Sequence, residues 1–168
     1  MSRKLKMVAD PISLHTYYLQ VIIKRIKTMK KSNEKVVIEV NASAEKVWEI
    51  IGAVGGVDKW FAPVIQTCRV EGDKRICGTE AGEFTENIKK VDHAHMVFEY
   101  EIPVQNMIPV EHIAGKMKVS DIGDGKSTVE WSATFNVEED KEAQAKEMIR
   151  GAWTMGIKGI EKVASGQA

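Results

Sequence analysis

The sequence has 168 residues, of which 43% are hydrophobic and 29% charged, and its 24 Lys and Arg are balanced by 24 Asp and Glu. This length and composition are typical of one globular domain with a substantial core. Because the net charge is zero, nothing global indicates nucleic-acid binding, and two cysteines are too few for a secreted disulfide scaffold. The sequence contains neither a run of about 18 apolar residues nor a recognisable signal peptide, so we expect a cytoplasmic protein.

The charge is unevenly distributed along the chain. Residues 1–31 hold eight Lys and Arg against one Asp, a net charge of +7, and the remainder holds 16 against 23 acidic residues, which gives −7. After Pro11, apolar residues recur at helical spacing and basic residues follow, so we predict a basic amphipathic N-terminal arm. Such an arm suits packing or oligomerisation, an extension of little consequence, or weak contact with an anionic membrane surface.

The first elements of the domain are a strand and two short helices. Alternating apolar and polar residues predict a strand over residues 35–41. Ser43 is a typical helix N-cap, and Val47 and Trp48 lie on the apolar face of the helix that follows. A glycine-rich stretch ends this helix, and a second short helix is predicted over residues 57–61.

A hairpin is predicted next. Residues 64–71 and 74–79 flank a Gly-Asp turn. With a two-residue loop, Cys68 lies directly opposite Cys77, close enough for their side chains to touch. Two interpretations remain open: a pair of reduced, packed thiols, as expected in a cytosolic protein, or a redox pair.

The strand predicted over residues 83–91 places Phe84, Glu86 and Ile88 on one face. A buried carboxylate without a partner is unfavourable. Either this strand lies near the sheet edge with Glu86 in water, or Glu86 faces a polar group, water or a ligand.

The clearest alternation covers residues 95–102, with Phe98 and Tyr100 on the apolar face. The loop over residues 103–109 carries two apolar residues, Met107 and Ile108, as expected of a pocket lid or a contact surface. Two further strands, residues 110–122 and 127–137, are joined by a Gly-Asp-Gly turn. Their inward faces carry Ile113, Gly115, Met117 and Val119, and Val129, Trp131, Ala133 and Phe135.

The longest helix is predicted over about residues 140–163, beginning at Asp140 and ending near Gly166. One face is apolar or small and consists of Ala145, Met148, Ile149, Ala152, Met155, Gly156, Gly159, Ile160 and Val163. Each helical glycine costs about 1 kcal/mol relative to Ala. The glycines allow either close packing on the sheet or a thinned, Met-lined face with room for a ligand beneath it.

Together these elements predict the fold class. Six consecutive strands without crossover helices are mostly antiparallel. The order therefore predicts an α+β fold: a curved antiparallel seven-stranded sheet wrapped around a long C-terminal helix, with two short helices after the first strand. Because a straight helix cannot fill the hollow of a curled sheet, we expect an apolar cavity between them.

Motifs for common chemistries are missing. The sequence contains no Gly-rich phosphate loop, no HExxH or CxxC motif and no nucleophile elbow. The four histidines lack a metal-ligand spacing with carboxylates. The sequence therefore predicts no cofactor, no metal site and no nucleic-acid partner.

Several short segments follow one another in a characteristic order along the chain. They are Val47-Trp48, Trp60 with Pro63, residues 68–73, residues 85–92, residues 108–110, Gly123-Asp124-Gly125, and Val129-Glu130-Trp131 with Ala133 and Phe135. In this order they resemble the START-like (SRPBCC) superfamily, which includes bacterial polyketide cyclase/dehydrase and lipid-transport proteins, birch-pollen-allergen-like proteins and plant abscisic acid receptors. The likeness covers residues 34–164 and leaves out the arm, residues 1–31. It implies a helix-grip domain.

The resemblance also implies a hydrophobic ligand cavity, with inward positions at Gln66, Glu86, Tyr100, Ile113, Gly115 and Trp131. The sequence departs from its relatives in two places. The hormone receptors carry a lysine where Gln66 stands, which argues against hormone-like acid binding. The Asn-Tyr pair common in bacterial relatives is His112-Ile113, which removes a hydroxyl from the pocket.

We therefore expect binding or transport of a small hydrophobic molecule, such as a lipid, a polyketide-like aromatic compound or an isoprenoid, by a monomer or homodimer. The predicted ligand-binding residues, with Gln66 and Glu86 as polar anchors, are Gln66, Phe84, Glu86, Phe98, Tyr100, Ile113, Gly115, Trp131, Met148, Ala152 and Met155. The loops at residues 79–82 and 103–109 are expected to gate the entrance.

Two alternatives remain open. One is a cyclase or dehydratase in which Glu86 acts as general base and Tyr100 as proton donor. The other is a regulator or accessory folding factor that contacts another protein through an exposed loop at Met107 and Ile108.

Overall fold

The computed structural model describes residues 28–167. Their strands form one antiparallel seven-stranded sheet in the order β1-β7-β6-β5-β4-β3-β2. The strands are β1 (Met29–Val40), β2 (Thr67–Glu71), β3 (Lys74–Thr79), β4 (Gly82–Asp92), β5 (Val97–Ile102), β6 (Val110–Gly123) and β7 (Lys126–Glu138). The helices are α2 (Ala44–Ile51), α3 (Val57–Trp60) and α4 (Glu142–Ala164), preceded by the 3-10 turn Glu139–Lys141.

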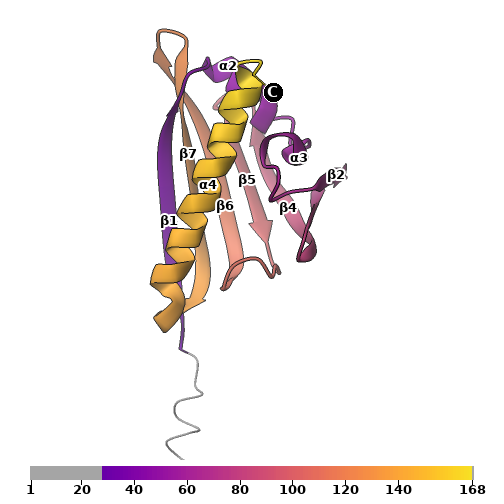
Figure 1. Ribbon diagram of the computed structural model, residues 1–168, viewed down its shortest axis with the longest axis vertical. Coiled ribbons are helices and arrows are strands. Elements are labelled where there is room, and N and C mark those ends of the chain that lie inside the picture. The colour runs from indigo at the N-terminus through magenta and orange to yellow at the C-terminus, as the bar shows by residue number, and fades with distance from the viewer. Residues whose placement is uncertain (1–27, 168) are drawn as a thin grey trace, which may run out of the picture.

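The long helix α4 lies across one face of the sheet, and α2 and α3 cover the same face near the C-terminal end of α4 (Figure 1). The predicted helix-grip architecture is therefore confirmed. None of the helices within residues 28–167 is long and apolar enough to cross a membrane.

Strand β1 is longer than its hydrophobic pattern indicated. It begins at Met29 rather than at residue 35, and it pairs with β7 along its whole length, from Met29 opposite Glu138 to Val40 opposite Ser127. Backbone pairing extends a strand into polar sequence that shows no apolar alternation. Residues 29–31, expected in the N-terminal arm, therefore belong to the sheet, whereas residues 1–27 of that predicted arm lie outside the described residues.

A bulge in β6 aims its side chains at the core. The register with β7 shifts between Glu111 and Ala114, and His112 adopts a φ of 52°. The shift allows Val110 and Ile113 both to be buried although they are three residues apart. Strict alternation would have turned one of them to solvent.

The buried stripe of α4 is rotated from the predicted one. It consists of Ala145, Ile149, Trp153, Gly156, Ile157 and Ile160, so Trp153 and Ile157 were missed by the prediction. Met148 and Met155 are 40% and 46% exposed because they lie beside this stripe. Asp140 lies in the 3-10 turn instead of capping α4, whereas Gly166, with a φ of 72°, follows the end of the helix as predicted.

Two of the three glycines of α4 allow close packing. A Cβ at Gly159 would overlap the carbonyl oxygen of Trp60 in α3, and a Cβ at Gly156 would lie 3.0 Å from the ring of Trp131. A Cβ at Gly151 would have no neighbour within 4 Å. The close-packing interpretation is therefore correct for Gly156 and Gly159, although Gly159 meets a helix rather than the sheet.

Polar contacts fix the two ends of α4 to β1 and to Asn41, the residue that follows this strand. At the N-terminal end, Glu142 accepts a hydrogen bond from Ser32 at 2.5 Å and pairs with Lys30 at 2.5 Å. These contacts lower the pKa of Glu142 to about 2, with the Lys30 contribution the largest. At the other end, Glu161 accepts hydrogen bonds from the backbone and side-chain nitrogens of Asn41, both at 2.8 Å.

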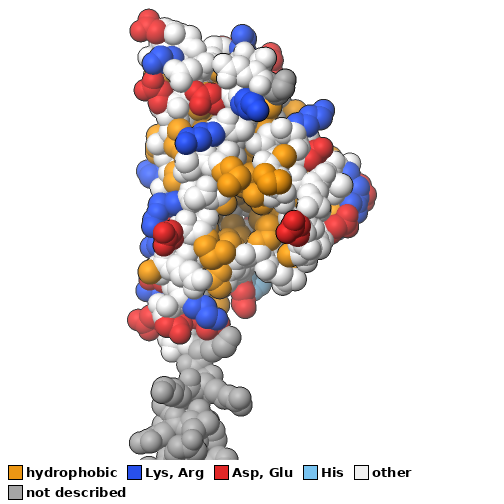
Figure 2. Space-filling model, viewed as in Figure 1, with side chains coloured by type: hydrophobic (Ala, Val, Ile, Leu, Met, Phe, Trp, Pro, Cys, Tyr) orange, Lys and Arg blue, Asp and Glu red, His pale blue; other side chains and the backbone are white. Residues whose placement is uncertain are grey.

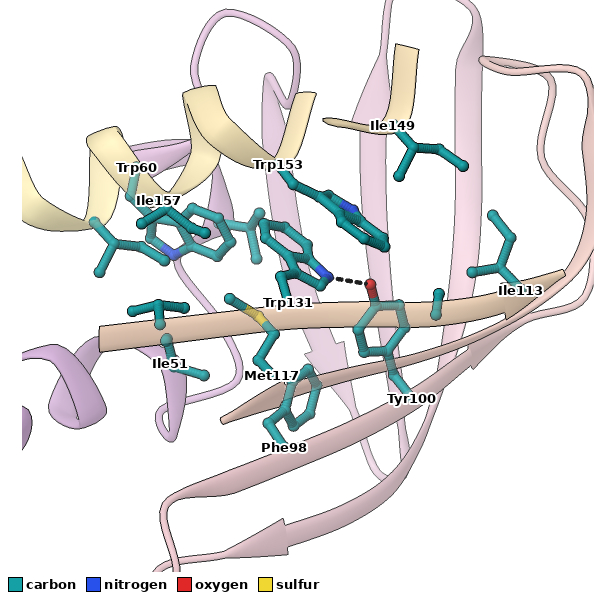
Figure 3. Close-up of a cluster of buried hydrophobic side chains, with 14 of the residues drawn as sticks. Ile51, Trp60, Phe98, Tyr100, Ile113, Met117, Trp131, Ile149, Trp153 and Ile157 are labelled. Carbon is teal, nitrogen blue, oxygen red and sulfur yellow. Dashed lines mark hydrogen bonds between the residues drawn. The ribbon is translucent and has the colours of Figure 1, made fainter. Parts of the chain in front are cut away.

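The core between sheet and helix is rich in aromatic rings. Trp131 stacks on Trp153, with centroids 5.4 Å apart, and meets Trp60 edge to face at 6.2 Å. Figure 3 shows this cluster and the hydrogen bond from Trp131 to Tyr100. Because Trp153 and Trp131 come from α4 and β7, this stack anchors the helix over the sheet.

Candidate functional site

A cavity of about 370 Å³ lies between α4 and the sheet. Figure 2 shows a hollow surrounded by hydrophobic side chains near the centre of the face that carries α4. The wall comes from the segment between α3 and β2, from strands β4 to β7, from the loop over residues 103–109 and from α4. Its residues are Phe61, Val64, Ile65, Phe84, Glu86, Tyr100, Ile102, Gln105, Met107, Ile108, Ile113, Trp131, Ala133, Phe135, Met148, Ile149, Ala152, Trp153 and Met155. Few of these side chains are polar, so the cavity suits an apolar ligand.

Eight of the eleven predicted ligand-binding residues line this cavity: Phe84, Glu86, Tyr100, Ile113, Trp131, Met148, Ala152 and Met155. The prediction missed mainly residues before β2, in the loop over residues 103–109 and on α4. Trp153 could have been found from its spacing of four residues after Ile149.

The expectation that Gln66 faces inward is wrong. Gln66 is exposed and does not line the cavity, so it is not a polar anchor there. Its backbone N–H donates to Gly78 O at 2.8 Å at the start of the β2–β3 hairpin. The neighbouring residues Val64 and Ile65 form this part of the wall instead.

Phe98 and Gly115 lie behind the wall rather than in it. Phe98 is fully buried, and its ring packs at 5.5 Å from the Tyr100 ring. A Cβ at Gly115 would overlap the ring of Tyr100, so the glycine makes room for that ring. Both residues therefore position Tyr100 without lining the cavity.

The variant Gly115→Ala tests this role. The added methyl group forces the Tyr100 ring out of its place, so the hydrogen bond to Trp131 is expected to break and the protein to lose about 1–3 kcal/mol of stability. Chemical denaturation measures the loss, and a Trp fluorescence spectrum measures the change around Trp131. The exposed Ala114 provides the control: Ala114→Ser should change neither quantity. An unchanged spectrum for Gly115→Ala would show that Tyr100 does not depend on this glycine.

Glu86 is buried and paired. It is 5% exposed, lies directly opposite Arg75 in the β3–β4 register, and accepts a hydrogen bond from Arg75 Nε. The interpretation that places Glu86 in water at a sheet edge is therefore wrong. The partner was available from the sequence, because a hairpin that turns between Thr79 and Gly82 sets residue 75 opposite residue 86.

Arg75 is held from three sides. Its Nη1 donates to Val54 O at 2.7 Å, and its Cζ lies 4.9 Å from the centroid of the Phe98 ring. Val54 has a φ of 65°, which is unusual for a β-branched residue and turns this part of the backbone toward the guanidinium. Burial works to lower the pKa of Arg75, but the attraction of Glu86 outweighs it, and the pKa lies above its ordinary value.

Tyr100 is the second polar group of the cavity. Its hydroxyl oxygen accepts a hydrogen bond from Trp131 Nε1 at 2.8 Å (Figure 3). Burial, reinforced by the charge of Glu86, raises the pKa of Tyr100 above its usual range. The hydroxyl therefore keeps its proton, and within residues 28–167 it donates that proton to no other group.

Gln105 organises the loop over residues 103–109. Its Nε2 donates to Ile108 O at 2.9 Å and Val110 O at 2.7 Å, and its Oε1 accepts from Met107 N at 2.7 Å and Ile108 N at 3.0 Å. One amide thus fixes the backbone of the loop, and the half-buried Met107 and Ile108 face the cavity.

Replacing Gln105 by Leu is expected to loosen this loop, because both backbone N–H groups lose their acceptor. Amide hydrogen exchange at Met107 and Ile108 should accelerate by roughly tenfold, the effect of about one hydrogen bond. Asn106→Leu, at an exposed position of the same loop, is the control and should leave these rates unchanged. Equal rates in both variants would show that Gln105 does not hold the loop.

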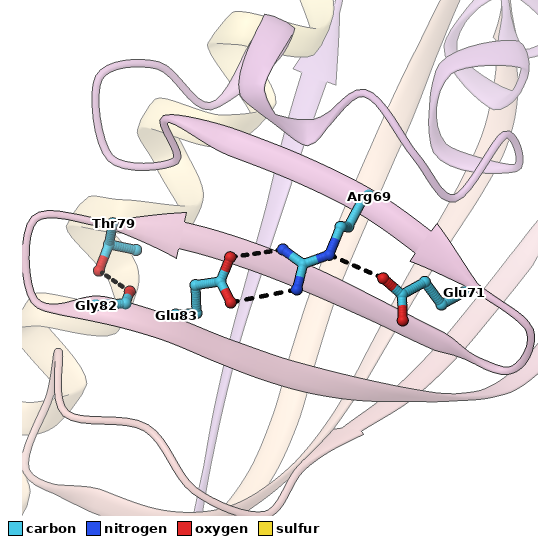
Figure 4. A network of polar contacts seen from close by, with 5 residues as sticks. All are labelled: Arg69, Glu71, Thr79, Gly82 and Glu83. Carbon is cyan, nitrogen blue, oxygen red and sulfur yellow. Dashed lines mark hydrogen bonds and ion pairs between the residues drawn. The ribbon is translucent and has the colours of Figure 1, made fainter.

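The loop at residues 79–82 lies beside the cavity rather than in its wall. It borders a depression of about 400 Å³ that also contains Pro63 and shares Val64 and Met107 with the cavity. Thr79 Oγ1 spans this loop by donating to Gly82 O at 2.9 Å (Figure 4). On the neighbouring strands, Arg69 bridges Glu83 at 2.5 Å and Glu71 at 2.9 Å (Figure 4).

The predicted register of the two cysteines is confirmed, since Cys68 lies directly opposite Cys77. Both are free thiols. Burial raises the pKa of Cys77, so this thiol stays protonated and is a weak nucleophile.

Solved structures with this architecture show what the chain is similar to. An uncharacterised protein from Bacillus thuringiensis superposes with a TM-score of 0.71 at 22% identity, covering 79% of this chain and 98% of the other. Truncated norcoclaurine synthase from Thalictrum flavum gives 0.65 at 14% identity, and the Zhui aromatase/cyclase from Streptomyces sp. R1128 gives 0.64 at 17%. Each of these two covers 81% of this chain and 94% of the other. At such identities the likeness concerns the fold alone.

The sequence itself matches one family. No curated protein matches it significantly. The sequence model of the family described as polyketide cyclase / dehydrase and lipid transport matches residues 33–164, which include every residue of the cavity wall. The chain therefore belongs to the polyketide cyclase/dehydrase and lipid transport family.

Proposed function

We propose that this protein binds a small hydrophobic molecule in the cavity beneath α4 and carries it within the cytoplasm. The observation that carries the proposal is the cavity itself, about 370 Å³ in volume and walled almost entirely by apolar and aromatic side chains. When an apolar ligand displaces water from a wall of this kind, apolar surface is buried and the free energy of the system falls.

The rim of the cavity supports the same function. Met148 and Met155 line the cavity and are 40% and 46% exposed, so they lie between the interior and solvent. Methionine side chains are flexible and adapt to ligands of different shape. The loop held by Gln105 adds Met107 and Ile108 to the wall, and its opening would give a ligand access.

A cyclase or dehydratase is the second candidate, because Glu86 and Tyr100 both line the cavity. Their contacts suit hydrogen bonding to a ligand better than proton transfer. Glu86 is the counter-charge of Arg75, and the raised pKa of Tyr100 makes its proton harder to release. His112 is exposed on the β6 bulge and does not line the cavity. Mass spectrometry of a bound ligand before and after incubation would detect turnover, which a carrier does not produce.

The third hypothesis, an exposed docking loop, is not supported. Met107 and Ile108 are half-buried against the cavity rather than exposed as a contact patch.

Filling the cavity tests the proposed function. Ala152 lines the cavity from α4, so Ala152→Phe places a ring inside it and should weaken binding of the neutral fluorophore Nile red by roughly tenfold or more. The matched control is Ala143→Phe, at an exposed position of the same helix, which should bind as the wild type does. If wild type, Ala152→Phe and Ala143→Phe all bind the dye equally, the cavity is not the binding site.

A further inference from the structure

We propose that the cavity selects an uncharged aromatic ligand with a hydroxyl group, a phenol or aryl alcohol, and discriminates against carboxylates. The inference rests on the proposed binding function and specifies the chemistry of its ligand. It follows from which polar atoms of the wall are engaged by the protein and which remain for a ligand.

Most polar atoms of the wall are already used. Both donors of the Gln105 amide and its oxygen bond to the loop backbone. The N–H of Trp131 is used by the Tyr100 hydroxyl. The Tyr100 proton, the indole N–H of Trp153 and one oxygen of Glu86 have no partner among residues 28–167. The wall of the cavity therefore offers two donors and one acceptor, and two of the residues that carry them, Glu86 and Tyr100, both lie against Arg75, whose Cζ is 5.9 Å from the centroid of the Tyr100 ring.

The negative charge of Glu86 disfavours an anionic ligand in this cavity. Glu86 lines the cavity, whereas its partner Arg75 does not, since it is covered by the Val54 carbonyl and the Phe98 ring. The negative member of the ion pair thus faces the ligand and the positive member lies behind it. A carboxylate placed here would lose its hydration and meet a like charge in an apolar environment, which is strongly unfavourable.

A ligand hydroxyl satisfies two of these three groups, the oxygen of Glu86 and the proton of Tyr100, whose residues both lie against Arg75. Its O–H donates to the free oxygen of Glu86, and its lone pairs accept the proton of Tyr100. An ammonium group would satisfy Glu86 but leave the Tyr100 donor unpaired, and a hydrocarbon would leave both unpaired. Sites built to hydrogen-bond a hydroxyl reject analogues that lack it, because their own buried groups are then unsatisfied.

The walls favour a flat ring system. Phe61, Phe84, Phe135, Trp131 and Trp153 contribute aromatic rings from four different parts of the chain. Aromatic rings pack on a flat ligand through offset or edge contacts in addition to excluding water.

Four ligands that share one ring system test the proposal: naphthylmethanol, naphthoate, naphthylmethylammonium and methylnaphthalene. Competition against Nile red at neutral pH gives their dissociation constants with the full-length protein. The alcohol is expected to bind about 10- to 100-fold more tightly than the hydrocarbon, the effect of one or two hydrogen bonds to buried polar groups. The carboxylate should bind more weakly than the hydrocarbon.

Two variants test whether Tyr100 and Glu86 cause the preference for the alcohol over the hydrocarbon. Tyr100→Phe removes only a hydroxyl, and Arg75→Met/Glu86→Leu removes both charges of the buried pair. In each variant the ratio of alcohol to hydrocarbon affinity should fall toward one while hydrocarbon binding persists. Glu83→Gln, an exposed carboxylate on the same strand as Glu86, is the control and should keep the wild-type ratio.

The outcomes separate this inference from the proposed function. If neither Nile red nor any of the four compounds binds, the proposed function fails and the inference fails with it. If all bind but the carboxylate equals or exceeds the alcohol, the cavity binds apolar ligands and the proposed selectivity is wrong. If the ammonium compound binds most tightly, the proposed selectivity is also wrong and the cavity prefers a cationic ligand. If the ratio of alcohol to hydrocarbon affinity is unchanged in both variants, Glu86 and Tyr100 do not determine the selectivity.

Discussion

Glu86→Gln is expected to destabilise the protein by on the order of 3–5 kcal/mol, because it removes the counter-charge of a cation that stays buried. Arg75 is 4% exposed, and its other contacts, the Val54 carbonyl and the Phe98 ring, carry no full negative charge. Urea denaturation of the purified variant measures the change in the free energy of unfolding.

Two further variants show whether the buried charge is the cause. Arg75→Met/Glu86→Leu replaces the pair by apolar side chains and should unfold within about 1–2 kcal/mol of the wild type, since removing both charges also removes the cost of desolvating them. Glu83→Gln, which faces solvent on the same strand, should have little effect. A double variant no more stable than Glu86→Gln would contradict this explanation.

Gly159→Ala is expected to cost about 3 kcal/mol, although an alanine normally stabilises a helix relative to glycine. The added Cβ would overlap the carbonyl oxygen of Trp60, and this oxygen belongs to the α3 backbone, which cannot rotate away as a side chain can. The helices must separate, and the stacked rings of Trp60 and Phe61 are expected to shift with α3. Because Phe61 lines the cavity, ligand binding should weaken together with stability.

Gly151→Ala is the matched control for this substitution. Gly151 lies in the same helix, and a Cβ there has no neighbour within 4 Å. The alanine should therefore stabilise the protein by about 1 kcal/mol, its intrinsic helix preference. Thermal unfolding of both variants measures the two effects, and a destabilised Gly151→Ala or a stabilised Gly159→Ala would contradict the packing assigned to α4.

The sequence predicted the site best where the side chains alternate regularly. Phe84, Glu86, Tyr100 and Trp131 were placed inward from a period of two along β4, β5 and β7, and all four line the cavity. The prediction failed at Gln66, which was placed inward by resemblance alone and which lies before β2 rather than within the strand predicted over residues 64–71. A resemblance to relatives is weak evidence for the direction of a single side chain at such a position.

The order of elements, the antiparallel sheet and the hairpin register that sets Cys68 opposite Cys77 could all be predicted from the sequence, because they depend on local periodicity and turn length. Contacts between distant segments had to be seen to establish which face of α4 is buried, that the β6 bulge buries Val110 together with Ile113, and which end of the Arg75–Glu86 pair meets the cavity. These features depend on contacts between segments distant in sequence. Local patterns specify a strand or a helix, whereas its rotation and depth follow from what packs against it.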